Sequence, residues 1–211
     1  MYLPAHFAET RIDVLQRFIA EHPLGMLVTL GADGLDANHL PVEYDPSPAP
    51  RGTLRMHVAR ANPVWKNFSE GVEALLVLQG PQAYVSPSWY ASKKETGKVV
   101  PTYNYMVVHA HGTLTAIEDH AWLRGLVERL TNRHESVMPA PWKVGDAPEP
   151  YVDQMLAAIV GLELSITRIT GKWKLSQNRS ASDRDGVARG LADATDPQAV
   201  AIAEAMKACK G

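Results

Sequence analysis

The spacing of apolar residues predicts one helix near the start of the chain and a series of strands after it. Over residues 9–21, apolar side chains between Ile12 and Ile19 recur every three or four positions, which is helical spacing. We expect this helix to end before Pro23, because a residue that precedes proline disfavours helical geometry. The strands that we expect span residues 25–30, 37–44, 54–59, 73–80, 83–87, 104–117 and 161–169. This number of strands favours a β-barrel.

Apolar and polar side chains alternate along the strand expected at 104–117. Even-numbered positions from Met106 to Ala116 carry mostly small apolar side chains, whereas His109 and His111 share the other face with threonines. Successive side chains of a strand point to opposite faces, so we expect one face in a core and the other in polar surroundings. The two histidines suit either a metal ion or a hydrogen-bonded structural pair, and the lack of nearby Cys or carboxylate favours the pair.

Three more helices are predicted from periodic spacing and from residues that begin helices. Asp119 is suited to cap a helix over residues 119–135, and a shorter helix follows Pro150. Asp196 and Pro197 are a typical start for a last helix. We expect the first two helices to cover an end of the barrel and the last to pack on the body or on a second subunit.

Composition excludes several classes of protein. The 211 residues include 21 Lys and Arg against 23 Asp and Glu, and the formal net charge of −2 gives no general attraction to nucleic acid. The single cysteine, Cys209, cannot form an internal disulfide. No apolar run approaches the roughly 20 residues that span a bilayer. We therefore expect a cytoplasmic protein that does not enter a membrane.

Candidate chemistry begins at the end of the strand over 54–59. The chain lacks the glycine-rich nucleotide motifs, the GxSxG elbow and the HExxH motif. Arg60 and Asn62 directly follow the strand, where a guanidinium and an amide can bind a phosphate. An ordinary Asn-Pro turn beside a surface arginine is the alternative.

Two further segments suit a planar ligand. Pro41 interrupts a strand after His39 and Leu40, which is tolerated at a sheet edge or where a sheet opens and exposes its backbone. Aromatic residues flank the lysine-bearing loop over 92–98, and they suit a heteroaromatic ring, a dimer interface or a core. These aromatic residues are Trp89, Tyr90, Tyr103 and Tyr105.

The run GKWKLSQNR at 171–179 concentrates cations after the last strand. Lys172, Lys174 and Arg179 either close over an anionic ligand or form a solvated tail. The run is also the only plausible nucleic-acid patch, yet the helix over 119–135 has mixed charge and no character of a basic recognition helix. The sequence therefore disfavours direct DNA recognition.

Several motifs together resemble the PaiB family. They are MYLPAHF (1–7), HLP (39–41), HVARANPVW (57–65), GPQAYVSPSWY (80–90), VPTYNY (100–105), HE (134–135) and KWKLSQNR (172–179). Their order and spacing agree with the family up to about residue 180. Tyr103 departs from the pattern, because the family has Trp there.

The resemblance implies an α+β fold, mainly β with peripheral helices: an FMN-binding split barrel like that of pyridoxamine phosphate oxidase. This domain would cover 1–180 with a helical insertion at about 119–160, and residues 181–211 would form a helical extension. FMN would lie at a homodimer interface, with its phosphate on the loop after a central strand. The residues implied to bind it are His39, Leu40, Pro41, His57, Val58, Ala59, Arg60, Asn62, Thr102, Asn104, Lys174, Gln177 and Asn178.

The family is described as negative transcriptional regulators, so the resemblance implies repression, either direct or indirect. The alternative is an FMN-dependent oxidoreductase that uses NAD(P)H or oxidises a small molecule, because the flavin itself carries hydride chemistry. No residue stands out as a catalytic acid or base, and His39, His57 and Tyr103 are the nearby candidates. A weaker third possibility is haem binding through His109 or His111.

Overall fold

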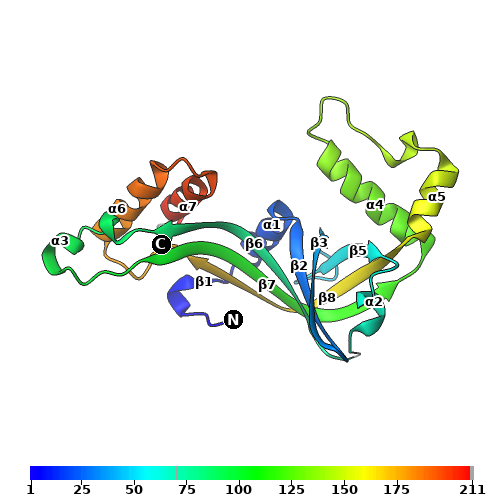
Figure 1. Ribbon diagram of the computed structural model, residues 1–211, viewed down its shortest axis with the longest axis horizontal. Coiled ribbons are helices and arrows are strands. Elements are labelled where there is room, and N and C mark those ends of the chain that lie inside the picture. The colour runs from blue at the N-terminus through cyan, green and yellow to red at the C-terminus, as the bar shows by residue number, and fades with distance from the viewer. Residues whose placement is uncertain (70, 210–211) are drawn as a thin grey trace. The chain divides into compact units, whose positions relative to one another are not determined.

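The computed structural model describes residues 1–69 and 71–209 and contains one eight-stranded sheet. The strand order is β3-β2-β6-β7-β8-β5-β4, and β1 pairs with β8 (Figure 1). Helices account for 37% and strands for 35% of the chain, and the predicted α+β class is confirmed.

The strands are β1 (Ala8–Glu9), β2 (Leu24–Gly31), β3 (Gly34–Pro41), β4 (Glu43–Asp45), β5 (Thr53–Ala59), β6 (Ala74–Val85), β7 (Thr102–Ile117) and β8 (Ile159–Lys174). The α-helices are α1 (Ile12–Glu21), α2 (Val64–Asn67), α3 (Lys93–Thr96), α4 (His120–Glu135), α5 (Glu149–Ala157), α6 (Ala181–Ala192) and α7 (Pro197–Ala208). Three short 3₁₀ turns, η1 (Ala5–Phe7), η2 (Pro87–Trp89) and η3 (Val144–Asp146), complete the assignment.

The helix starts predicted from capping residues are confirmed. The side chain of Asp119 accepts a hydrogen bond from the amide of Trp122 at 2.7 Å. Asp196 likewise accepts from the amide of Gln198 at 3.0 Å, with Pro197 in the first turn of α7. Each cap satisfies an amide that the helix itself leaves without a partner.

Two predictions of strands need correction. The separate strands expected at 73–80 and 83–87 form the single strand β6. The pairing of β2 with β6 ends at Leu78, so Pro81, which has no N–H, lies beyond that ladder. The strand expected at 37–44 instead divides into β3 and β4.

Helix α6 lies in the helical extension expected at 181–211, but apolar spacing does not mark it as a separate helix, because Gly186 and Gly190 weaken its helical pattern. Both glycines lie against Trp89. A Cβ atom at Gly186 would come within 2.1 Å of the carbonyl oxygen of Trp89, and one at Gly190 within 2.5 Å of its ring. Packing therefore requires small residues where the local helical propensity alone would favour larger ones.

The chain separates into two compact units. Residues 1–15, 79–108 and 170–211 form one unit, here called the terminal unit, and residues 16–78 and 109–169 form the other, the central unit. The strands β6, β7 and β8 and the helix α1 each contribute residues to both units. The predicted division at residue 180 stays a prediction.

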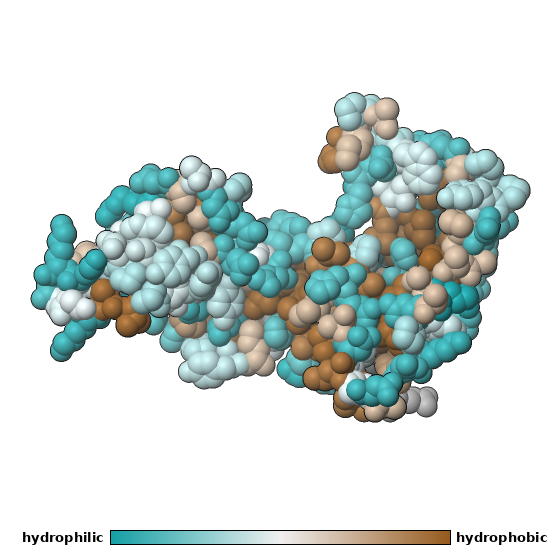
Figure 2. Space-filling view, viewed as in Figure 1, coloured by the Kyte–Doolittle hydropathy of each residue, from teal (hydrophilic) through white to brown (hydrophobic). Residues whose placement is uncertain are grey.

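Helices α4 and α5 of the central unit have a small core of their own, formed by Leu123, Val144, Val152 and Leu156. Several large apolar side chains of this region are exposed, including Val137 and Trp142. Apolar surface over the two helices is visible in Figure 2. Among residues 1–69 and 71–209, no helix has the length and apolar character needed to span a membrane.

Candidate functional site

The central unit brings two of the predicted ligand-binding segments together. The side-chain amide of Asn62 donates to the Oδ1 atom of Asn38 at 2.7 Å, which ties the loop after β5 to the edge strand β3. Asn62 Oδ1 also accepts from the amide of Val64 at 2.9 Å, at the start of α2. The loop beside His39 is therefore held by specific hydrogen bonds.

Along β3, alternate residues face different surroundings. Leu40 is buried, whereas its neighbours His39 and Pro41 are exposed. Within residues 1–69 and 71–209, β3 pairs along one edge with β2 and lies at the end of the strand order. The predicted edge strand is thus confirmed, and it offers backbone groups that the sheet does not occupy.

Within β5 the predicted residues are placed unequally. Val58 belongs to the core, so its side chain is not available to a ligand, whereas Ala59 is exposed. His57 is half-buried, and burial lowers the pKa of its imidazole. A neutral imidazole can accept a proton near neutral pH.

The guanidinium of Arg60 is engaged within the protein. Nε donates to the carbonyl oxygen of Ala157 at 2.8 Å and Nη2 to that of Ile159 at 3.1 Å. Nη1 donates to the carboxylate of Glu118. Arg60 also accepts, through its own carbonyl, a hydrogen bond from the indole of Trp65 at 3.0 Å. Binding of a phosphate by Arg60 would require the remaining N–H groups or an exchange of partners.

The terminal unit contains a separate small cavity of about 100 Å³, here called the Lys174 cavity. It is lined by Tyr90, Val100, Pro101, Thr102, Asn104, Lys174, Ser176, Asn178 and Arg179. Four of the predicted ligand-binding residues, Thr102, Asn104, Lys174 and Asn178, therefore share one cavity. Gln177 does not line it: its side chain donates to the carbonyl of Trp173 and accepts from the amide of Leu175.

One wall of the Lys174 cavity is held by a buried pair. Asn104 is fully buried, and its Nδ2 donates to the hydroxyl of Ser176 at 3.0 Å. The Ser176 hydroxyl donates to Asn104 Oδ1 at 3.2 Å. Ser176 adopts a φ of 62°, a left-handed backbone geometry that costs free energy for any residue except glycine.

The cavity is cationic. The ammonium of Lys174 donates to the hydroxyl of Thr102 and to the carbonyl of Tyr103, the latter at 2.6 Å. The guanidinium of Arg179 lies 4.9 Å from the centre of the Tyr90 ring. Burial lowers the pKa of Lys174, and the charges of Lys172 and Arg179 lower it further. An anion in the cavity would offset this repulsion.

Tyr90 and Arg179 are not among the residues that the family resemblance implies for FMN, although Arg179 belongs to the cationic run and Tyr90 to the aromatic group that suit a ligand. The hydroxyl of Tyr90 is buried and has no hydrogen-bond partner in the part of the chain that the structure describes. The only available signal was the proximity of an aromatic cluster and a cationic run, and the sequence does not show that they meet.

The two strand histidines depart from the prediction. The rings of His109 and His111 lie 6.4 Å apart. Nε2 of His111 is buried without a hydrogen-bond partner among the described residues, so the hydrogen-bonded pair is wrong at this atom. Burial lowers the pKa of both imidazoles. Within residues 1–69 and 71–209, no group of three or more potential metal ligands occurs.

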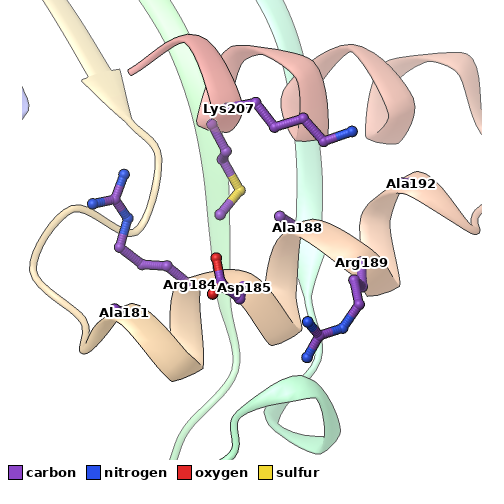
Figure 3. Close-up of a pocket in the computed structure, with 8 residues that line it drawn as sticks. Ala181, Arg184, Asp185, Ala188, Arg189, Ala192 and Lys207 are labelled. Carbon is purple, nitrogen blue, oxygen red and sulfur yellow. The ribbon is translucent and has the colours of Figure 1, made fainter. Parts of the chain in front are cut away.

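A larger groove of about 520 Å³ lies between α6 and α7 in the terminal unit. Figure 3 shows Lys207 on α7, and the small side chains Ala188 and Ala192 on α6. Arg184 and Asp185 line the same groove. None of the predicted ligand-binding residues belongs to it.

Comparison with known proteins relates the chain to flavin-binding families. The family model described as "Putative FMN-binding domain" matches residues 1–168. An uncharacterised protein of Aspergillus fumigatus is 35% identical, with 98% of this chain and 97% of the relative covered. The Bacillus subtilis protein "Protease synthase and sporulation protein PAI 2" is 30% identical, with 98% and 97% covered.

Solved structures share the fold at low sequence identity. The FAD and haem binding protein from Mycobacterium smegmatis aligns with a TM-score of 0.61 and 18% identity over 87% of this chain and 80% of that one. The flavocytochrome Anf3 from Azotobacter vinelandii aligns with a TM-score of 0.54 and 15% identity over 79% and 69%. The fold implied by the motif resemblance is confirmed, and by its family match and its similarity to PAI 2 the chain belongs to the PaiB family of FMN-binding domains.

Proposed function

We propose that this protein is an FMN-binding negative regulator of transcription, located in the cytoplasm. The observation that carries the flavin site is the hydrogen bond between Asn38 and Asn62, which joins the edge strand β3 to the loop after β5. The sequence motifs assigned both segments to one ligand, and this contact supports that assignment. The regulatory part rests on the similarity to PAI 2, whose name refers to protease synthesis and sporulation.

In this proposal the flavin ring lies along β3 and its phosphate lies at the loop after β5. The ring is largely apolar with a few polar atoms, which suits the exposed Pro41 and His39 with backbone groups at a sheet edge. Asn62 and the remaining N–H groups of Arg60 would serve the phosphate. When bound, FMN would supply reversible hydride and electron transfer.

We further propose that the protein is a homodimer in which the second copy covers the flavin. A small barrel is filled by its own side chains, so a ligand of this size needs a groove outside it. The edge strand β3 carries Leu35, which is 78% exposed, as an apolar contact for a partner. A single species at the monomer mass in light scattering, with FMN bound, would contradict this arrangement.

The flavin site is tested by Asn62→Ala. We expect the purified wild-type protein to absorb at about 370 and 450 nm, the wavelengths at which the flavin itself absorbs. In a fluorescence titration, the Kd of Asn62→Ala for FMN should be at least about fivefold higher than that of the wild type, because the variant loses a polar contact. The control is Asn132→Ala, at an exposed position on α4. Equal affinities of both variants and wild type would refute the placement.

Regulation is tested separately from binding. We expect a reporter that the wild-type protein represses to be released by Asn62→Ala but not by Asn132→Ala. A gel-shift titration at two salt concentrations would show whether the protein touches DNA itself, because sequence-indifferent binding is lost as salt rises. With a net charge of −2, we expect repression through a partner or a metabolite rather than through tight DNA contact.

The alternative function is an FMN-dependent oxidoreductase. It is favoured by the half-buried His57, whose imidazole is held neutral by burial and can accept a proton. We expect an enzyme of this kind to bleach its bound flavin on addition of NAD(P)H without oxygen. Unchanged flavin absorption with both nicotinamides would leave only oxidation of another small molecule.

A further inference from the structure

The Lys174 cavity is lined by Tyr90, a buried tyrosine whose hydroxyl lacks a hydrogen-bond partner among the described residues. Tyr90 is only 2% exposed, and its hydroxyl has no hydrogen-bond partner among the described residues. Such a group has lost its hydrogen bonds to water without replacement, which destabilises the folded chain. Tyr90 lines the cavity, so a ligand there that reaches the buried hydroxyl would give it the missing partner.

The charges around the cavity call for an anion. Lys174 uses its ammonium for Thr102 and the carbonyl of Tyr103, which leaves one N–H of the three. Arg179 stacks over the ring of Tyr90. The carboxylate of Asp183 accepts hydrogen bonds from the amide and hydroxyl of Ser92 at 2.9 and 2.8 Å. Its negative charge offsets part of that of Arg179, whereas Lys172 adds to the positive charge beside Lys174.

The walls of the cavity are fixed before any ligand arrives. The buried amide of Asn104 binds the hydroxyl of Ser176, and Ser176 keeps a left-handed backbone. A wall that is already formed loses less conformational entropy when an anion binds than one that must first be ordered. The volume of about 100 Å³ admits a single compact group and excludes a tricyclic ring.

We propose that the Lys174 cavity binds a phosphate group, held by the hydroxyl of Tyr90, the ammonium of Lys174 and the guanidinium of Arg179. The group belongs either to FMN or to a second phosphorylated small molecule. The first source rests on the proposed function and moves the flavin phosphate away from Arg60. The second adds a substrate or effector site to it.

The first test is phosphate binding to the flavin-free full-length protein, measured by calorimetry with inorganic phosphate as the probe. We expect Tyr90→Phe to bind phosphate about tenfold more weakly, because one hydrogen bond to a charged group is lost. Lys174→Met should weaken binding at least as much. The matched control is Tyr84→Phe, which removes a hydroxyl from an exposed tyrosine of the same unit.

A second measurement keeps the test independent of folding. Tyr90→Phe removes only an unpartnered hydroxyl, so we expect its melting temperature without phosphate to equal or exceed that of the wild type. Added phosphate should raise the melting temperature of the wild type more than that of Tyr90→Phe. The proposal would be overturned if Tyr90→Phe has a lower melting temperature than the wild type without phosphate. It would also be overturned if phosphate raises the melting temperature of Tyr90→Phe as much as that of the wild type.

The source of the phosphate is settled by titrating FMN and riboflavin. If FMN supplies it, Tyr90→Phe weakens FMN but not riboflavin, and FMN displaces inorganic phosphate. If a second molecule supplies it, the FMN-saturated protein still binds inorganic phosphate, and Tyr90→Phe weakens that binding. Equal binding of FMN and of phosphate by wild type and Tyr90→Phe refutes the cavity. Failure of the wild type to bind any flavin refutes the proposed function instead.

Discussion

Substitutions of Ser176 measure the backbone strain in the wall of the Lys174 cavity. The φ of 62° at Ser176 is a geometry that costs a non-glycine residue about 1–2 kcal/mol. Two hydrogen bonds with the fully buried Asn104, at 3.0 and 3.2 Å, hold it there. We therefore expect Ser176→Ala to lose about 1–3 kcal/mol of unfolding free energy, because the buried amide is left without its partner and the strain remains.

Ser176→Gly loses the same hydroxyl but relieves the strain. We expect it to be more stable than Ser176→Ala by about 1 kcal/mol, against the usual order in which glycine is the less stable. The control pair is Ser165→Ala and Ser165→Gly, at an exposed position in β8, where we expect glycine to be less stable by about 0.5–1 kcal/mol.

The assay is equilibrium urea unfolding of all four variants, followed by circular dichroism and by tryptophan fluorescence. Agreement of the two signals establishes that one transition is observed. If Ser176→Ala is as stable as Ser176→Gly, the left-handed geometry does not store strain and the description of a rigid wall fails. If Ser165 shows the same inverted order, the effect is not specific to the cavity.

Three other predictions follow. If the flavin phosphate lies at the loop after β5, Arg60→Ala should weaken FMN binding by about 1.5–3 kcal/mol through loss of a charge-assisted hydrogen bond, and unchanged affinity in a fluorescence titration would place the phosphate in the Lys174 cavity instead. Gly161→Ala should cost about 1–3 kcal/mol of unfolding free energy in urea because its Cβ would lie 2.3 Å from the ring of Trp122. Gly145→Ala should be nearly neutral, because its Cβ would have no described atom within 4 Å. Burial lowers the pKa of His57, so as pH falls below about 6.5 the unfolded chain takes up a proton before the folded chain does, and the free energy of unfolding should fall. His57→Gln should reduce this dependence of the unfolding free energy on pH. Parallel curves of unfolding free energy against pH for the variant and the wild type would contradict the prediction.

The features that the sequence predicted correctly depend on neighbours within a few residues. Asp119 and Asp196 cap helices through the amides of residues that directly follow them. The alternation along β7 places Val108 and Leu114 in the core, as expected. Such features need only local geometry, and a single sequence contains it.

The features that the sequence did not predict depend on residues that are distant along the chain. The glycines of α6 look like helix breakers until Trp89 is seen against them. Arg60 looked like a free cation, yet Glu118 and the carbonyl of Ala157 occupy its guanidinium. In each case the partner lies far away in sequence and no local pattern names it.

The same argument separates the two candidate anion sites. Arg60 was selected because its residue type and position suit a phosphate, but the fold has already given three of its nitrogens partners. Tyr90 stands out in the sequence only as one of several aromatic residues. The fold buries its hydroxyl without a hydrogen-bond partner among the described residues, and Tyr90 lines a cavity with two cations. A donor that already has a hydrogen-bond partner must break that bond before it can bind a ligand, whereas a donor without a partner loses nothing. The same ligand contact therefore contributes more net binding free energy at Tyr90 than at Arg60. We therefore expect Tyr90→Phe to lower phosphate affinity by a larger factor than Arg60→Ala does, and the reverse order would return the phosphate to the loop after β5.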